Sequence, residues 1–111
     1  MDLVKWATDK NKEYSKENIE FTTYCMDKMQ QRDISREIVI SSITSNVLSF
    51  VELQKRPFQG GIEERYQLVY RISSRYFLLI VVVYDERVLK VINVIKTSKD
   101  MEKIWRKKIL K

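Results

Sequence analysis

Hydrophobic and polar residues alternate most regularly between residues 65 and 72, in the segment RYQLVYRI. A strand turns every second side chain to the same face, so this alternation predicts a strand with one core face and one basic face. The core face would hold Tyr66, Leu68, Tyr70 and Ile72, and the basic face Arg65, Gln67, Val69 and Arg71. The next segment, YFLLIVVVY at 76–84, is apolar throughout, as expected of a strand covered on both faces. We expect 76–84 to be the central strand of a sheet.

Two further segments are predicted strands, NVLSFVEL at 46–53 and VLKVINVIK at 88–96. Short turns between successive strands favour antiparallel pairing. Between the first two strands lies QKRPFQGGIEE at 54–64, where Pro57 and the pair Gly60-Gly61 are typical of a loop. Loops of this length often carry function.

Helical patterns precede and follow these strands. Residues 22–32 predict a helix that is capped by Thr22 or Thr23 and ends at Asp33. Ser35 is a candidate cap for a second helix over 35–45, although its β-branched residues leave a strand as the alternative. Residues 98–109 form an amphipathic closing helix, in which Thr97 and Asp100 have the spacing of a capping box.

The predicted fold class is α+β: an antiparallel four-stranded sheet packed with two or three helices, flanked by those at 22–32 and 98–109. A short edge strand at Ile19–Phe21 is a further candidate. The partial helical periodicity near the start predicts an N-terminal helical arm at 1–18, followed by a single α+β domain at 19–111. A chain of 111 residues can bury one core of ordinary size and is too short for two independent domains.

Composition narrows the classes of function. Lys and Arg number 21 against 15 Asp and Glu, and the formal net charge of +6 attracts polyanions. The longest apolar run has nine residues, whereas a membrane span needs roughly 20, so we expect no membrane partner. One cysteine, Cys25, excludes an internal disulfide and favours a cytoplasmic location. The chain has no histidine, so we predict no metal centre and no cofactor.

The segment FTTYCMDKMQQRDIS, residues 21–35, resembles the opening motif of the domain-of-unknown-function 4258 family. The positions that match this motif are Thr22, Met29, Arg32, Ile34 and Ser35. The chain departs from it at four positions, where Tyr24 replaces the family's histidine, Cys25 an alanine, Lys28 an arginine and Asp33 a glycine. The segment VINVIKTSKDMEKIW at 91–105 is similar to the family's closing strand, with its Thr-Ser-Lys at 97–99. The resemblance covers residues 20–105.

The layout of that family looks like the RelE and BrnT toxins, small basic ribonucleases of toxin–antitoxin pairs. The resemblance therefore implies a RelE-like layout, RNA as the substrate and a small antitoxin-like protein as a partner. Tyr24 stands where the family has histidine, and a phenol is a much weaker acid than an imidazolium. We expect the row of Tyr24, Lys28 and Arg32 to be the relic of a family site that binds an anion but transfers protons poorly.

Metal-independent RNA cleavage needs a base near the 2′-hydroxyl, cations for the charge that grows on phosphorus, and an acid for the leaving oxygen. The chain offers tyrosines, lysines and arginines for these roles. The chemical candidates are Tyr24, Arg65, Arg71, Arg75, Tyr84 and Lys96, of which Tyr24, Arg65 and Arg71 are the predicted catalytic residues. The predicted nucleic-acid-binding residues are Lys28, Arg32, Arg65, Arg71, Arg75 and Lys96.

Simpler interpretations stand beside these. The row at 24, 28 and 32 has the spacing of a solvated helix face, and Arg65 and Arg71 could sit on an exposed sheet face. The strand tyrosines could stack on bases or simply be core; they are Tyr66, Tyr70, Tyr76 and Tyr84. A second hypothesis is a non-catalytic module that binds nucleic acid or protein through the sheet edge or the loop at 54–64. A third is a homodimer built on Leu3 and Trp6 of the arm.

Overall fold

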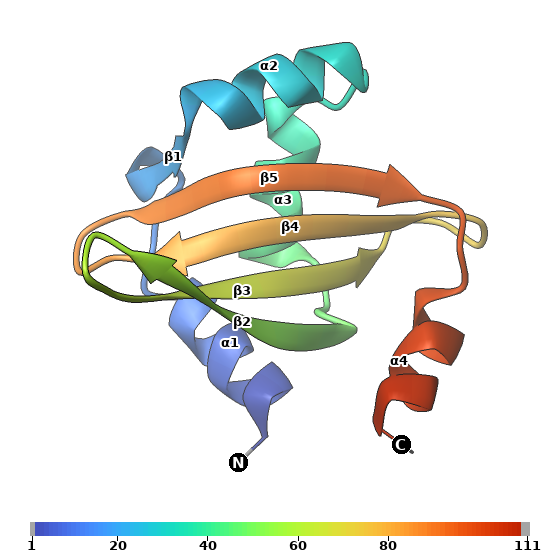
Figure 1. The fold of residues 1–111 in the computed structure, drawn as a ribbon. Helices are drawn as coiled ribbons and strands as arrows, with labels where there is room; N and C mark the ends of the chain where they lie inside the picture. The colour runs from blue at the N-terminus through green and yellow to red at the C-terminus, as the bar shows by residue number, and fades with distance from the viewer. Residues whose placement is uncertain (1, 110–111) are drawn as a thin grey trace.

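Four α-helices and five β-strands make up residues 2–109, the part of the chain that this computed structural model describes (Figure 1). Of Trp105 and Ile109 only the backbone is described, and residues 1, 110 and 111 of the predicted arm and domain lie outside the described residues. In chain order the elements are α1 (Leu3–Asn11), a 3₁₀ turn (Lys16–Asn18), β1 (Ile19–Phe21), α2 (Thr23–Gln31), α3 (Arg36–Ser45), β2 (Phe50–Phe58), β3 (Gly61–Arg71), β4 (Phe77–Tyr84), β5 (Leu89–Thr97) and α4 (Met101–Ile109). The predicted α+β class is confirmed. No helix within 2–109 is long and apolar enough to cross a membrane.

The strands form one mixed sheet in the order β1-β5-β4-β3-β2. β2 to β5 are antiparallel neighbours, and β4 lies at the centre as predicted. The prediction of a four-stranded antiparallel sheet is wrong, because β1 adds a fifth strand that runs parallel to β5, with Ile19 opposite Leu89. These two strands are distant in the sequence, so no turn fixes their relative direction, and local pattern carries no signal for their pairing.

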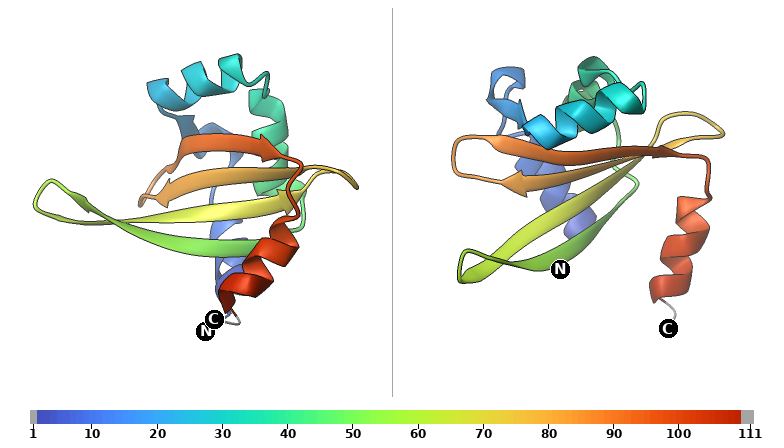
Figure 2. Two further views of the ribbon diagram at one scale, coloured as in Figure 1. Left: turned by 45° about the vertical axis from the view of Figure 1, so that its right-hand side comes forward. Right: turned by 45° about the horizontal axis from the view of Figure 1, so that its top comes forward.

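The segment 54–64, predicted to be a loop, is the tip of a long β-hairpin. β2 remains paired with β3 until Phe58 lies opposite Gly61. Pro57 is tolerated because β2 is an edge strand, where a missing backbone donor interrupts no second ladder. Gln59 and Gly60 form the turn with φ angles of 48° and 79°, the backbone of a two-residue type I′ hairpin. Figure 2 shows this hairpin projecting past the other strands.

The two helices after β1 begin where the sequence predicts. The Thr22 hydroxyl accepts a hydrogen bond from the Cys25 N–H at 3.1 Å, and the Ser35 hydroxyl accepts one from the Ile38 N–H at 3.3 Å. Side-chain caps of this kind satisfy backbone donors that have no partner inside the helix. The second cap opens α3, so the helix is confirmed over the alternative strand at 35–45.

Single residues also determine where α2 ends and where α4 begins. Asp33 takes a left-handed backbone, with a φ of 54°, directly after α2, where the family motif has glycine. Asp100 caps α4, since its carboxylate accepts a hydrogen bond from the Lys103 N–H at 3.1 Å. Thr97 accepts instead from the Lys99 N–H before the helix, so the predicted capping box is not formed.

The main core lies between the sheet and the helices α1 and α3, which cover one of its faces (Figure 1), and α2 adds Cys25 and Met29 to it beside β5. α1, predicted as an arm, packs on this face with Ala7 fully buried. The Trp6 ring lies 5.0 Å from the ring of Tyr66 and 5.5 Å from that of Tyr84, measured between centroids. Leu3 also packs against this core, so the side chains that motivated a homodimer are used within the chain.

The opposite face of the sheet is covered in part by α4. Met101 packs there on a smaller apolar cluster, whose buried members are Phe50, Val69, Phe77 and Leu79. The Lys108 ammonium of α4 donates to the Glu52 carboxylate of β2 at 2.9 Å, which ties the helix to the edge strand. These contacts lie at the end of the sheet away from the projecting hairpin, and a groove opens on the other part of this face.

Candidate nucleic-acid interface

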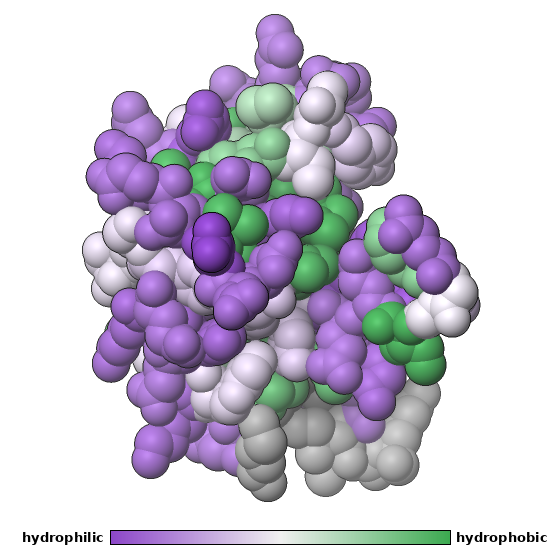
Figure 3. All heavy atoms as spheres, turned by 90° about the vertical axis from the view of Figure 1, so that its left-hand side faces the viewer, coloured by the Kyte–Doolittle hydropathy of each residue, from purple (hydrophilic) through white to green (hydrophobic). Residues whose placement is uncertain are grey.

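A groove with a volume of about 650 Å³ opens on the uncovered part of the sheet, between α2 and the projecting hairpin. Figure 3 looks at this end of the molecule and shows a lobe standing off the main body, with hydrophobic surface in the hollow between them. The groove, here called the hairpin groove, is lined by Thr22, Tyr24, Gln54, Arg56, Phe58, Glu63, Arg65, Val81, Lys90, Ile92 and Asn93.

The hairpin forms one wall of the groove because its strands alternate. Arg56 and Phe58 are two positions apart on β2, so both point to the face that carries the groove. Arg65 and Glu63 stand in the same relation on β3, and Glu63 lies directly opposite Arg56 in the strand register. The two-residue turn fixes this register and therefore the placement of all four side chains.

The groove is electropositive. Its charged lining consists of three cations, Arg56, Arg65 and Lys90, and one carboxylate, Glu63. The Arg65 Nε donates to the Glu63 Oε1 at 2.6 Å, an ion pair that holds both side chains against the sheet. Lys90 lies 3.9 Å from the Asp85 carboxylate, at the outer limit of a salt bridge. Because cations outnumber carboxylates, the groove attracts anions.

The predicted row on α2 meets the groove at one end. Tyr24 lines the groove with its side chain 56% exposed, and the Lys28 ammonium lies 5.6 Å from the centroid of its ring. Arg32 donates from Nη1 to the Asn93 Oδ1 at 2.8 Å and to the Val94 carbonyl at 2.7 Å, which fastens α2 to β5. The row is therefore a set of distinct contacts, with Tyr24 at the groove and Arg32 at the strand.

The structure separates Arg71 and Arg75 from this site. Arg71 shares a strand and a face with Arg65, but it lies six positions further along, which is about 20 Å along a strand. Its guanidinium lies 4.7 Å from the centroid of the Phe77 ring and 3.5 Å from the Glu102 carboxylate of α4. Arg75 is exposed in the turn between β3 and β4, at the same distant end. Of the predicted catalytic residues, Tyr24 and Arg65 come together in the groove.

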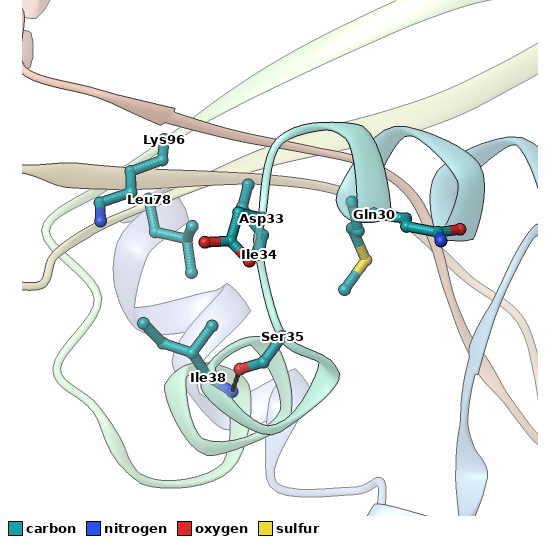
Figure 4. Close-up of a pocket in the computed structure, with 8 residues that line it drawn as sticks. Gln30, Asp33, Ile34, Ser35, Ile38, Leu78 and Lys96 are labelled. Carbon is teal, nitrogen blue, oxygen red and sulfur yellow. Dashed lines mark hydrogen bonds between the residues drawn. The ribbon is translucent and has the colours of Figure 1, made fainter.

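Lys96 lies in a different pocket, of about 300 Å³, in the corner between α2, α3 and the sheet. Figure 4 shows Lys96 at one side of this pocket, with Asp33 beside Leu78 and Ile38. The Lys96 ammonium is 4.6 Å from the centroid of the Tyr76 ring. Because Lys96 pairs with the fully buried Leu78 in the strand register, it belongs to the helix-covered face and not to the groove.

The strand tyrosines other than Tyr76 are part of the core. Tyr84 donates its hydroxyl to the Asn11 Oδ1 at 2.6 Å, and the Asn11 amide donates to the Tyr70 hydroxyl at 3.2 Å. Burial raises the pKa of Tyr70 and of Tyr84. Burial, followed by the hydrogen bond to Glu64, raises the pKa of Tyr66 to about 12. A catalytic base needs the opposite shift, so these phenols are structural.

Sequence reasoning missed Arg56, Phe58 and Lys90. The first two fall in the segment interpreted as a loop, where Pro57 and the glycines obscured the strand pattern. The alternation of β3 extends back from Arg65 to Glu63, and this extension was the available signal that the hairpin is longer than predicted. Lys90 faces the groove because a bulge in β5 shifts the register between Val81 and Val82 of β4.

The groove is better equipped for binding than for proton transfer. Apart from the arginines, its titratable groups are Tyr24, Glu63 and Lys90; Glu63 is engaged by Arg65, and Lys90 lies near the Asp85 carboxylate. The only thiol of the chain, Cys25, is fully buried, and burial raises its pKa to about 11. Within the described part of the chain, no three His, Cys, Asp or Glu side chains gather as a metal site. The arrangement can bind a phosphate-bearing ligand with an aromatic portion.

Comparison of the chain with protein-family models, with curated proteins and with solved structures found no match in any of the three. The resemblance to the 4258 family therefore stays a prediction that rests on the motifs at 21–35 and 91–105.

Proposed function

We propose that this protein binds RNA through the hairpin groove and cleaves RNA weakly or not at all. The observation that carries the proposal is the meeting, in one groove, of three cations with an exposed tyrosine, while a single carboxylate faces them. Cations bind phosphates, and aromatic rings bind bases, so this combination suits a nucleic acid better than an acidic protein. The motif resemblance, which implies RNA as the substrate, points the same way.

Cleavage by the predicted catalytic residues would use Tyr24 as the base beside Arg65. A metal-independent endoribonuclease is the second candidate, and its specific support is that these two predicted catalytic residues line the same groove. Tyr24 stands in place of the family's histidine, and Arg65 is bound to Glu63. A phenol accepts a proton poorly at neutral pH, and the one carboxylate of the groove lining is held in the ion pair with Arg65, so binding without efficient cleavage is the better supported function.

A protein partner is compatible with RNA binding by the groove. A small antitoxin-like protein, implied by the same resemblance, would be expected to compete with RNA if it covered the groove. An acidic partner of this kind would complement the formal charge of +6. Addition of such a partner would then release bound RNA.

Binding of a fluorescently labelled single-stranded RNA, measured by anisotropy over a range of salt concentrations, tests the proposal. We expect the affinity to fall steeply with salt, because bound cations displace counterions from phosphates. Arg56→Ala should weaken binding and lower the slope of log affinity against log salt by about one. Arg106→Ala is the matched control, since Arg106 is exposed on α4 outside the groove, and it should change neither quantity.

Two outcomes would contradict the proposal. Absence of RNA binding at low salt, or binding that does not depend on salt, would remove RNA from the groove. Gel analysis of the same RNA addresses catalysis: efficient cleavage that is lost in Tyr24→Phe, with the fold intact by circular dichroism, would establish the endoribonuclease instead.

A further inference from the structure

The aromatic side chains of this protein are distributed unevenly between core and surface. Among the described side chains, the aromatic ones with substantial exposure are Tyr24 at 56% and Phe58 at 51%. They come from α2 and β2, which are far apart in the sequence, yet both line the hairpin groove. Exposure of single apolar residues is ordinary, but two exposed rings in one electropositive groove need a common explanation.

Each ring is attached to a hydrogen-bonded element of secondary structure. Tyr24 lies in the first turn of α2, which the Thr22 cap fixes, and the Thr22 N–H donates to the Val91 carbonyl of β5 at 3.1 Å. Phe58 is the last residue of β2, directly before the two-residue turn, and is paired with Gly61. The two rings therefore stand on different walls of the groove, one on the helix side and one on the hairpin side.

The surface between these walls is chemically divided. Val81 and Ile92 provide apolar lining, while the cations Arg56, Arg65 and Lys90 line the same groove. The Asn93 side-chain oxygen accepts hydrogen bonds from Arg32 and from the Val94 N–H, which fixes the orientation of its amide. A nucleotide matches this division, because its flat base can lie on the apolar lining while its phosphate meets the cations.

We propose that the hairpin groove holds an unpaired base between Tyr24 and Phe58, so that its ligand class is single-stranded RNA. This inference rests on the proposed function and specifies its substrate. The groove volume of about 650 Å³ lies within the roughly 300–1,000 Å³ of typical small-ligand sites, so a nucleotide can be accommodated. Bases of a duplex are stacked inside the helix and present only their edges and the backbone, so a duplex cannot place a base between the two rings.

The first test compares a single-stranded RNA with a duplex of the same sequence. We expect the wild-type protein to bind the single strand about tenfold more tightly at one salt concentration, since base–aromatic stacking commonly changes affinity by about this factor for each base. Equal affinity for the two forms would overturn the base-binding inference and leave RNA binding by the groove intact. Absence of binding to either form would overturn the proposed function itself.

The second test addresses the rings. Phe58→Leu and Tyr24→Leu should each weaken binding to the single strand about tenfold and leave duplex binding unchanged. Phe58→Tyr should recover most of the affinity that Phe58→Leu loses, because it restores a ring. Ile62→Ala is the matched control: Ile62 is 71% exposed on the same hairpin and does not line the groove.

A spectroscopic readout separates stacking from general hydrophobic contact. An RNA that carries 2-aminopurine should lose fluorescence on binding to the wild-type protein and less so on binding to Phe58→Leu, because the probe is quenched when it stacks. Unchanged affinity and fluorescence in either leucine variant, with circular dichroism confirming the fold, would overturn the sandwich. Equal binding of a DNA strand of the same sequence would keep the sandwich and replace RNA by single-stranded nucleic acid in general as the ligand class.

Discussion

The two halves of one sheet face differ sharply. In the half next to α4, Met101 closes over Phe77 and its neighbours, and the surface is a small second core. In the half next to the hairpin, no helix within residues 2–109 lies over the strands, and the surface is a charged groove that α2 borders on one side. β3 and β4 run through both halves without interruption. The contrast shows that one face of a strand can be buried at one end and form a binding surface at the other.

Arg65 and Arg71 illustrate the point within a single strand. Both are long cations on the same face of β3. Arg71 lies over the Phe77 ring and beside Glu102, so it helps to attach α4. Arg65 is paired with Glu63 of its own strand and lines an open groove. The covering helix, and not the strand, decides whether a cation on this face contacts α4 or lines the groove.

Loss of a ring should affect the two halves very differently in stability. Phe77→Ala removes a side chain that is 3% exposed, and we expect the free energy of unfolding to fall by about 3–5 kcal/mol. Phe58→Ala removes one that is 51% exposed, and we expect a change within about 0.5 kcal/mol. Urea denaturation followed by circular dichroism measures both. Similar losses in the two variants would show that the hairpin half is packed after all.

Loss of an arginine should lower RNA affinity in the hairpin half and not in the half next to α4. Arg65→Ala removes a groove cation and leaves Glu63 unpaired, so we expect RNA affinity to fall at least tenfold, on the order of one charge-assisted hydrogen bond. Arg71→Ala should leave affinity nearly unchanged and lower the free energy of unfolding by about 1 kcal/mol, through loss of its contacts with Phe77 and Glu102. Anisotropy titration and urea denaturation measure the two effects.

Sequence alternation alone assigned both arginines to the binding surface. The two variants therefore test whether residues on one strand face share one function. An equal loss of RNA affinity in both variants would extend the site over the whole face. An unchanged affinity in Arg65→Ala would remove Arg65 from the site.

Local patterns predicted the parts of the fold that local physics determines. The caps at Thr22 and Ser35, the buried central strand and the core face of β3 all follow from side chains within one element. The parallel pairing of β1 with β5 does not, because it depends on the path of the chain through two helices and three strands. The hairpin was missed because Pro57 and Gly60 are equally compatible with a loop and with an edge strand that ends in a tight turn.

The same limit applies to the site. Alternation fixes the face on which a residue lies but not its neighbours from other elements, so it named Arg65 and missed Phe58. Tyr24 was found through a motif, whereas Lys90 depends on a bulge that no local pattern reveals. A groove made by α2, the hairpin and β5 is a property of the assembled sheet.

The smallest expected effect concerns the turn that supports the hairpin half. Gln59 has a φ of 48°, a left-handed backbone that is unfavourable for most L-residues, and it precedes Gly60 with a φ of 79°. Asparagine followed by glycine is the preferred pair in a type I′ turn, so Gln59→Asn should stabilise the hairpin by about 0.5 kcal/mol. Because none of the described helices lies over the hairpin, we expect the gain as greater hydrogen-exchange protection of the β2 and β3 amides near the turn, with little change in global unfolding.

Gly60→Ala is the control of opposite sign for this turn. Apart from its neighbours in the chain, no described residue has an atom within 4 Å of a Cβ added at Gly60, so the loss, about 1 kcal/mol, reports the backbone conformation. Equal protection in both variants would mean that pairing along β2 and β3, and not the turn, holds the hairpin in place. A gain that spread to the amides of the half covered by α4 would mean that the two halves unfold as one unit, and the contrast between them would then hold for binding but not for stability.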